Sequence, residues 1–175
     1  MKAKEVLNFM VRLMFLLSVF GLDSNALSNE KSQWPRHRGD AALNGNSGQK
    51  IGTSLKLEWV FDAGDFLKSS VVVSGGVAFV GADTGIIHAV DIETGKEKWQ
   101  YKTGMGIEAP PLVHDGIVYI GSTDGFLYAF DAGNGKLKWK YETDGEIMGA
   151  ANQASRPQSK DSVIVVGSYD NFVHC

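Results

Sequence analysis

The chain has 175 residues, a formal net charge of −3 and one cysteine, Cys175. The charge is mild and the lysines and arginines are scattered, which argues against a nucleic-acid groove or a basic membrane-binding face. A single cysteine also excludes a disulfide within the chain.

Residues 1–26 are predicted to form an export signal. Lys2 and Lys4 make a basic start, and Leu13–Leu22 is an uncharged, mostly apolar run. Ser24 and Ala26 place small residues before a cleavage site after Ala26. The run is shorter than the roughly 20 apolar residues that cross a bilayer, although an uncleaved amphipathic anchor remains an alternative. We expect an exported chain, periplasmic or extracellular, with no transmembrane span after cleavage.

Residues 27–54 are predicted to be an N-terminal arm, and residues 55–175 a repeat domain. In the second part, short β-rich runs alternate with Asp-Gly and Gly-Gly turn signals, which are typical of hairpins. The predicted strands are 69–73, 77–80, 86–90, 96–101, 111–113, 117–120, 126–130 and 136–141.

An eleven-residue segment occurs twice, 40 positions apart, at Ala89–Trp99 and Ala129–Trp139. Another tryptophan, Trp59, lies 40 residues before Trp99. Four short strands in each repeat of about 40 residues predict the antiparallel blades of a β-propeller. A sandwich also has regular short strands, but it would not repeat a whole four-strand unit with the same tryptophan.

A third unit is incomplete. Val165–Val173 matches Tyr119–Leu127 if six residues are added in the polar stretch Ser155–Asp161. Asn171 then replaces a glycine that needs positive φ. Cys175 falls on the position of Ala89 and Ala129, so we expect it to be a small buried residue rather than a reactive thiol. The fold prediction is an all-β, incomplete propeller of two full blades and part of a third.

The segment Leu55–Phe61, with Trp59, matches the fourth strand of a blade that has no strands of its own ahead of it. Closure of a propeller takes about four to eight blades. We therefore expect the N-terminal part of a longer propeller, in which this strand completes the last blade.

The repeated segment is predicted to join the third strand of a blade to the fourth. Its aspartate accepts hydrogen bonds from the following turn, its glycine supplies the turn's backbone angles, and its tryptophan packs against the next blade's turn. The residues with this structural role are Ala89, Asp91, Thr94, Gly95, Trp99, Ala129, Asp131, Gly135, Trp139 and Trp59.

The pattern Ala89-x-Asp91-x-x-Thr94-Gly95-Lys96-x-x-Trp99 resembles the tryptophan-docking motif of the pyrroloquinoline-quinone (PQQ) β-propeller repeat family. Val118–Ala129 is similar to that family's strand-turn-strand core, and Trp34–Gly39 resembles the opening of many exported members. The resemblance covers most of residues 31–175. It implies the fold more firmly than a function, because one fold hosts many functions.

The resemblance leaves two functions open. Most members keep the propeller and bind no cofactor, which favours a non-catalytic scaffold that binds a protein or polymer. The alternative is a PQQ-dependent dehydrogenase, which uses calcium, an aspartate base and often adjacent cysteines. The chain has no adjacent cysteines, and Asp91, Asp124, Asp131 and Asp170 all lie in repeat turns. We expect no catalytic or metal-binding residue here, and PQQ with calcium only under the alternative.

A candidate binding site lies where the chain enters the innermost strand of each blade. Lys68, Glu108 and Met148 are equivalent positions whose residue types differ. Asn152 and Gln153 are polar where the preceding repeat has apolar residues. These five residues are predicted to contribute to a site on the channel face, although ordinary loop and edge positions would explain them too.

Overall fold

The computed structural model describes residues 33–40, 45, 52–159 and 161–175. They belong to a compact unit, Ser32–Cys175. The predicted export signal and most of the predicted arm lie outside the described residues. Within the described part, no helix has the length and apolar character needed to cross a membrane.

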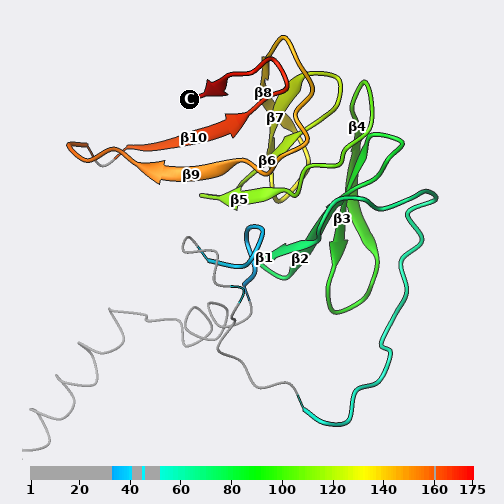
Figure 1. Ribbon diagram of the computed structural model, residues 1–175. Helices are drawn as coiled ribbons and strands as arrows, with labels where there is room; N and C mark the ends of the chain where they lie inside the picture. The colour runs from blue at the N-terminus through cyan, green and yellow to red at the C-terminus, as the bar shows by residue number, and fades with distance from the viewer. Residues whose placement is uncertain (1–32, 41–44, 46–51, 160) are drawn as a thin grey trace, which may run out of the picture. The chain divides into compact units, whose positions relative to one another are not determined.

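Three antiparallel sheets follow one another along the chain (Figure 1). The first blade contains β1 (Val72–Ser74), β2 (Val77–Gly81), β3 (Ile86–Asp91) and β4 (Glu97–Lys102). The second contains β5 (Leu112–His114), β6 (Ile117–Gly121), β7 (Phe126–Asp131) and β8 (Leu137–Glu142). The third contains β9 (Asn152–Ser155), β10 (Ser162–Gly167) and β11 (Val173–His174). The predicted class, two four-stranded blades and part of a third, is confirmed, and the added residues lie between β9 and β10.

Turn chemistry fixes the hairpins. Gly75 and Gly76 both have positive φ, and so do Asp115 and Gly116 in the second blade. A two-residue turn that matches the twist of its strands requires this conformation at both positions. Asn171 has φ 73°, so the prediction that it replaces a glycine in the third blade is confirmed.

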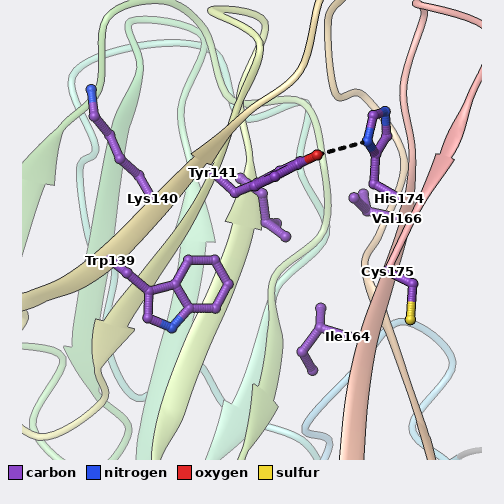
Figure 2. Close-up of a pocket in the computed structure, with 8 residues that line it drawn as sticks. Trp139, Lys140, Tyr141, Ile164, Val166, His174 and Cys175 are labelled. Carbon is purple, nitrogen blue, oxygen red and sulfur yellow. Dashed lines mark hydrogen bonds between the residues drawn. The ribbon is translucent and has the colours of Figure 1, made fainter.

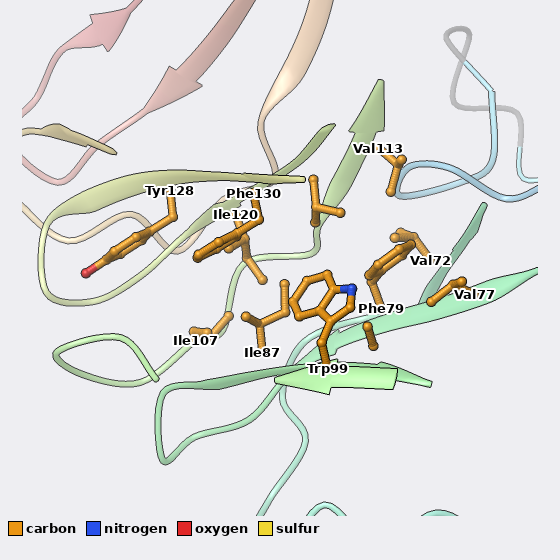
Figure 3. Packing of buried hydrophobic residues seen from close by; sticks show 12 residues of the cluster. Val72, Val77, Phe79, Ile87, Trp99, Ile107, Val113, Ile120, Tyr128 and Phe130 are labelled. Carbon is orange, nitrogen blue, oxygen red and sulfur yellow. The ribbon is translucent and has the colours of Figure 1, made fainter. Parts of the chain in front are cut away.

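Blades pack face to face through apolar side chains. Between the first and second blades, the ring of Trp99 lies between those of Phe79 and Phe130, at centroid distances of 5.8 and 6.2 Å (Figure 3). A smaller cluster joins the second and third blades and includes Leu127, Ile147 and Val166. The second strands β2 and β6 are buried almost throughout.

The blades approach each other closely at two equivalent glycines. A Cβ added at Gly81 would lie 2.1 Å from Cγ2 of Ile107, and one at Gly121 would lie 2.1 Å from Cγ2 of Ile147. The backbone closes the same contact, since Ile107 N donates to Ala82 O at 3.1 Å. The second and third blades are therefore each preceded by one isoleucine that packs on a glycine of the blade before.

The segment Leu55–Phe61 is extended but is not a strand, because no third strand lies beside it among the described residues. Its tryptophan is nevertheless held: Trp59 Nε1 donates to Ile92 O at 2.9 Å. The ring of Phe61 meets that of His88 at 5.3 Å. The segment is thus positioned on the first blade while its own backbone remains unpaired.

Candidate binding site

The repeated aspartates organise turns. Asp91 Oδ1 accepts hydrogen bonds from the backbone N and the hydroxyl of Thr94, both at 2.9 Å. These bonds, led by the hydroxyl, lower the pKa of Asp91. Asp131 accepts from Gly133 N at 3.1 Å in the second blade. The other oxygen of each carboxylate faces a lysine, since Lys98 Nζ lies 3.8 Å from Asp91 Oδ2 and Lys138 Nζ lies 3.4 Å from Asp131 Oδ2.

The turns Asp91–Gly95 and Asp131–Gly135 are each covered by the tryptophan of the preceding repeat unit. Trp99 Nε1 donates to Ala132 O at 2.9 Å, as Trp59 does to Ile92. The rings lie on Gly95 and Gly135, where an added Cβ would come within 2.6 and 2.5 Å of Trp59 and Trp99, respectively. Each indole therefore packs on the glycine of the next turn along the chain.

Two of the predicted site positions, Lys68 and Glu108, lie in one ion-pair cluster. Its Nζ lies 2.9 Å from Asp83 Oδ1 and 2.9 Å from Glu108 Oε1. Hydrogen bonds to Asp83 and then to Glu108 raise the pKa of Lys68. Sequence reasoning missed Asp83, because its turn position holds Thr123 and Tyr169 in the other blades. The cluster ties the first blade to the segment that enters the second.

Met148, Asn152 and Gln153 form a separate group on the third blade. Met148 borders a hollow of about 160 Å³ together with Gly167 and Tyr169. Asn152 is exposed, and Gln153 Nε2 donates to Ser162 Oγ at 3.0 Å. Among the described residues, no hydrogen bond or ion pair joins these three residues to Lys68 and Glu108, so the structure does not bring the five predicted positions together.

Ser162 extends the second group toward the second blade. His114 Nε2 lies 3.3 Å from Ser162 Oγ, the same hydroxyl that Gln153 reaches. Neither His114 nor Ser162 was predicted to belong to the site. Because six residues are added in the third repeat, the repeat alignment did not show which position Ser162 occupies. That alignment was the only feature of the sequence that could have placed Ser162 near the site.

The segment before the blades lies along the innermost strands. Trp34 exchanges two backbone hydrogen bonds with Val73 of β1, at 2.7 and 2.8 Å. Val113 N of β5 donates to Pro35 O at 2.7 Å. In the repeat, Gln153 of β9 is equivalent to Val73 and Val113, but no described backbone group pairs with it from outside its sheet. Within the part of the chain that the structure describes, the inner edge of the third blade is therefore uncovered.

A second hollow, of about 350 Å³, lies beside Trp139 at the third blade (Figure 2). Its lining is largely apolar and aromatic: Leu127, Trp139, Lys140, Tyr141, Ile164, Val166, His174 and Cys175. Tyr141 Oη and His174 Nδ1 are 3.2 Å apart across it. The prediction that Cys175 is buried is wrong: its side chain is exposed, and no fourth strand lies beside β11 among the described residues.

One strand position alternates between histidine and tyrosine. Tyr128 donates to Asp124 Oδ2 at 2.6 Å, and His174 Nε2 lies 2.8 Å from Asp170 Oδ2. Burial, and then the bond to Asp124, raise the pKa of Tyr128. In the first blade His88 is buried, and its Nδ1 lies 2.7 Å from Glu97 Oε1. These polar groups fasten strands within the blades.

The family model described as "Outer membrane protein assembly factor BamB" matches residues 38–173. The chain belongs to this PQQ-like repeat family. The predicted resemblance is thereby confirmed. No curated protein matches the sequence significantly.

Solved structures show the same fold. BamB from Moraxella catarrhalis is 24% identical, with a TM-score of 0.54 over 65% of this chain and 34% of that one. Quinohemoprotein alcohol dehydrogenase from Comamonas testosteroni is 22% identical, with a TM-score of 0.64 over 84% of this chain and 25% of that one. The enzyme ADHIIG from Pseudomonas putida HK5 is 19% identical, with a TM-score of 0.60 over 79% and 23%. The chain thus spans about a third or less of each.

The dehydrogenases raise the question of a calcium site. Calcium takes six to eight oxygen ligands, several of them carboxylates. The described residues hold no group of three or more His, Cys, Asp or Glu side chains that could bind a metal. Two carboxylates on the inner face, Asp83 and Glu108, are both paired with the single ammonium group of Lys68. The donors present in the described part do not fit a calcium-bound quinone.

Proposed function

We propose that this chain is a non-catalytic scaffold module of an exported protein, and that it binds an extended segment of a protein partner along the inner edge of its third blade. The observation that carries the proposal is the difference between inner edges. Trp34 and Pro35 occupy those of β1 and β5, whereas that of β9 is open. The family's description as an outer membrane protein assembly factor supports a protein partner.

An open strand edge binds extended peptides through backbone hydrogen bonds, while neighbouring side chains select the sequence. Trp34 and Pro35 demonstrate the geometry on this chain, since both use backbone groups to reach Val73 and Val113. Asn152 and Gln153 supply amides that both donate and accept. A protein satisfies this edge better than a polymer without a peptide backbone.

A labelled peptide of about ten residues with alternating apolar and polar side chains provides the probe, because that pattern is typical of outer-membrane strands. Fluorescence anisotropy measures its affinity for the chain. We expect the double variant Asn152→Ala and Gln153→Ala to weaken binding about fivefold or more. Gln100→Ala, an exposed glutamine on β4, is the matched control and should bind as the wild type does.

The predicted role of Lys68 and Glu108 has its own test. Glu108→Gln leaves a polar side chain of the same size and removes one of the two carboxylates that hold Lys68. If the inner face forms one continuous site, this variant combined with Asn152→Ala weakens peptide binding further. Unaltered binding in that pair, or no binding by the wild type, would sink the proposed site.

The alternative is a PQQ-dependent dehydrogenase. The likeness of fold to the quinohemoprotein enzyme over 84% of this chain favours testing it. Addition of PQQ and calcium to the protein should leave its melting temperature unchanged and should produce no dye reduction with an alcohol or a sugar. A raised melting temperature together with dye reduction would replace the scaffold by the enzyme.

Export rests on residues 1–26. Their basic start and short apolar run favour secretion to the periplasm or the exterior. Fusion of these residues to a reporter that folds only outside the cytoplasm should give signal. An arginine at Leu16, in the middle of the apolar run, should abolish that signal, and an arginine at Asn8, before it, should not.

A further inference from the structure

The turns of the blades gather at two opposite ends of the strands. At one end, which we call the entry end, the segments that lead into each blade meet the turns between second and third strands. Ile147 N, for example, donates to Ser122 O at 3.1 Å. At the other end lie the turns that the tryptophans cover, where Ala132 N donates to Gly116 O at 2.9 Å. The two sets of turns are therefore separated by the length of the strands.

Negative charge is concentrated at the entry end. This end comprises residues 62–68, 82–85, 102–108, 122–125, 142–148 and 168–171. These residues include nine carboxylates but only two lysines and no arginine. The tryptophan-covered turns and the residues that follow them, 91–98 and 131–138, contain four carboxylates and four lysines. A charged partner is therefore attracted or repelled mainly by the entry end.

The segment 142–148, which leads from the second blade into the third, is the most acidic part of the entry end. It contains Glu142, Asp144 and Glu146, all of them exposed, and no lysine or arginine. Among the described residues, no ion pair involves any of these three carboxylates. Both blades that the segment joins are present in the structure, so these carboxylates are uncovered with both neighbouring blades in place.

Other carboxylates at the entry end differ because a cation of the chain lies beside them. Asp83 and Glu108 both contact the ammonium group of Lys68 at 2.9 Å. One lysine between two carboxylates still leaves this cluster with an excess negative charge. The inner face is therefore acidic from the first blade to the start of the third.

The acidic segment 142–148 leads directly into β9. The four residues of β9 span about 13 Å, whereas an extended peptide of ten residues is about 33 Å long. A peptide held on the inner edge of β9 therefore extends beyond the strand. On the entry side it comes near the carboxylates of the acidic segment, and their attraction acts over about 8–10 Å at moderate salt. On the other side it meets Arg156 and Asp161, whose charges are opposite.

The chain itself shows the direction in which an inner edge is paired. The bridge between Trp34 and Val73 is antiparallel. A segment bound to β9 in the same manner runs antiparallel to it. β9 begins at Asn152, next to the acidic segment, and ends at Ser155. The C-terminal end of the bound segment therefore lies at the entry end.

We infer that the partner segment is cationic, with lysines or arginines at its C-terminal end, where it leaves β9 toward Asp144 and Glu146. The inference rests on the proposed function, because it names the charge and the direction of the peptide that the inner edge of β9 binds. Backbone hydrogen bonds hold the segment, and the unpaired carboxylates select its charge. An acidic segment in the same place is disfavoured by repulsion between like charges.

Three charged versions of the alternating peptide test the inference, each with both ends blocked. One carries two lysines at its C-terminal end, one carries them at its N-terminal end, and one carries two glutamates at its C-terminal end. At low salt, we expect the first to bind about threefold more tightly than the second and about tenfold more tightly than the third. At high salt the three affinities should converge, because the charges are screened.

Variants of the chain locate the charges that select the peptide. Asp144→Asn combined with Glu146→Gln removes two exposed carboxylates and keeps the size of both side chains. We expect this double variant to bind the C-terminal lysine peptide about three- to fivefold more weakly at low salt. It should bind the uncharged peptide as the wild type does, which also shows that it is folded. Glu93→Gln, at an exposed carboxylate of the opposite end, is the control and should bind both peptides normally.

The outcomes separate this inference from the proposed function. Equal affinities for the uncharged, lysine and glutamate peptides would overturn the inference and leave the proposed function intact. Tighter binding of the peptide with N-terminal lysines would overturn the assigned direction. An undiminished preference for C-terminal lysines in the double variant would place the selecting charges elsewhere and overturn the assignment to the acidic segment. Absence of binding by every peptide would overturn both proposals.

Discussion

The repeated eleven-residue segment has different fates in the first and second blades. Trp99 is 9% exposed, lies between Phe79 and Phe130, and donates to Ala132 of the next blade. Trp139 is likewise preceded by a lysine and followed two positions later by a tyrosine, but it is 41% exposed and borders a cavity. The difference shows that the indole is buried by the turn of the following blade. The strand that carries the tryptophan determines where the indole lies, but it does not itself bury the ring.

Substitution of the two tryptophans should separate these environments most strongly. We expect Trp99→Ala to lower the free energy of unfolding by about 3–5 kcal/mol, because a large side chain leaves a packed cluster. Trp139→Ala should cost about 1 kcal/mol or less, since much of its ring already contacts solvent. Urea unfolding followed by circular dichroism measures both.

Equal costs for the two substitutions would contradict the idea that the following turn supplies the stabilisation. A large cost for Trp139→Ala alone would place the main packing of both rings within their own sheets.

Two glycines allow the effect of the indole contact to be distinguished from the effect of a positive φ. Gly135 and Gly116 have nearly the same positive φ, 70° and 71°, but only Gly135 lies beneath an indole. Alanine at either position is strained by its φ, and at Gly135 its Cβ would also press into Trp99. We expect Gly135→Ala to cost about 1–3 kcal/mol more than Gly116→Ala, measured by urea unfolding. Equal costs would mean that the indole moves aside freely.

Local features were predictable because local chemistry decides them. Asp-Gly and Gly-Gly turns give hairpins whatever surrounds them, and Asn171 takes positive φ for the same reason. The 40-residue register also brought Lys68 and Glu108 to one ion-pair cluster. Equivalent positions in adjacent blades are neighbours in space, so the repeat itself carried that information.

The features that the sequence did not predict depend on which other segments lie beside them in space. The repeat alignment assigned Cys175 a buried position, but burial there needs a fourth strand, and none is beside it. Asp83 joined Lys68 although its position holds other residue types elsewhere. Leu55–Phe61 matched a strand yet has no ladder, because a strand requires a partner as well as a pattern.

A third comparison concerns the aspartate that forms a hydrogen bond with the histidine or tyrosine on the third strand of a blade. Asp124 serves Tyr128 and Asp170 serves His174, whereas Thr84 stands at that place before His88. Nε2 of His88 is consequently buried without a hydrogen-bond partner. We expect Thr84→Asp to stabilise the chain by about 1 kcal/mol by supplying an acceptor. Asp124→Ala should destabilise by a similar amount, and thermal unfolding compares the two.

The smallest expected effect distinguishes the two docking turns by pH. Thr94 donates its hydroxyl to Asp91, whereas Asn134 instead accepts from Lys136 N at 2.9 Å. Because the pKa of Asp91 is lowered in the folded state, its contribution to stability is complete above its usual value of 3.8 and is lost as pH falls through the lowered pKa. Thr94→Ala moves that pKa back toward 3.8, so the urea midpoint should fall less steeply with acid than in the wild type. Asn134→Ala should leave the steepness unchanged, and identical slopes for both variants would assign the acid sensitivity to other carboxylates.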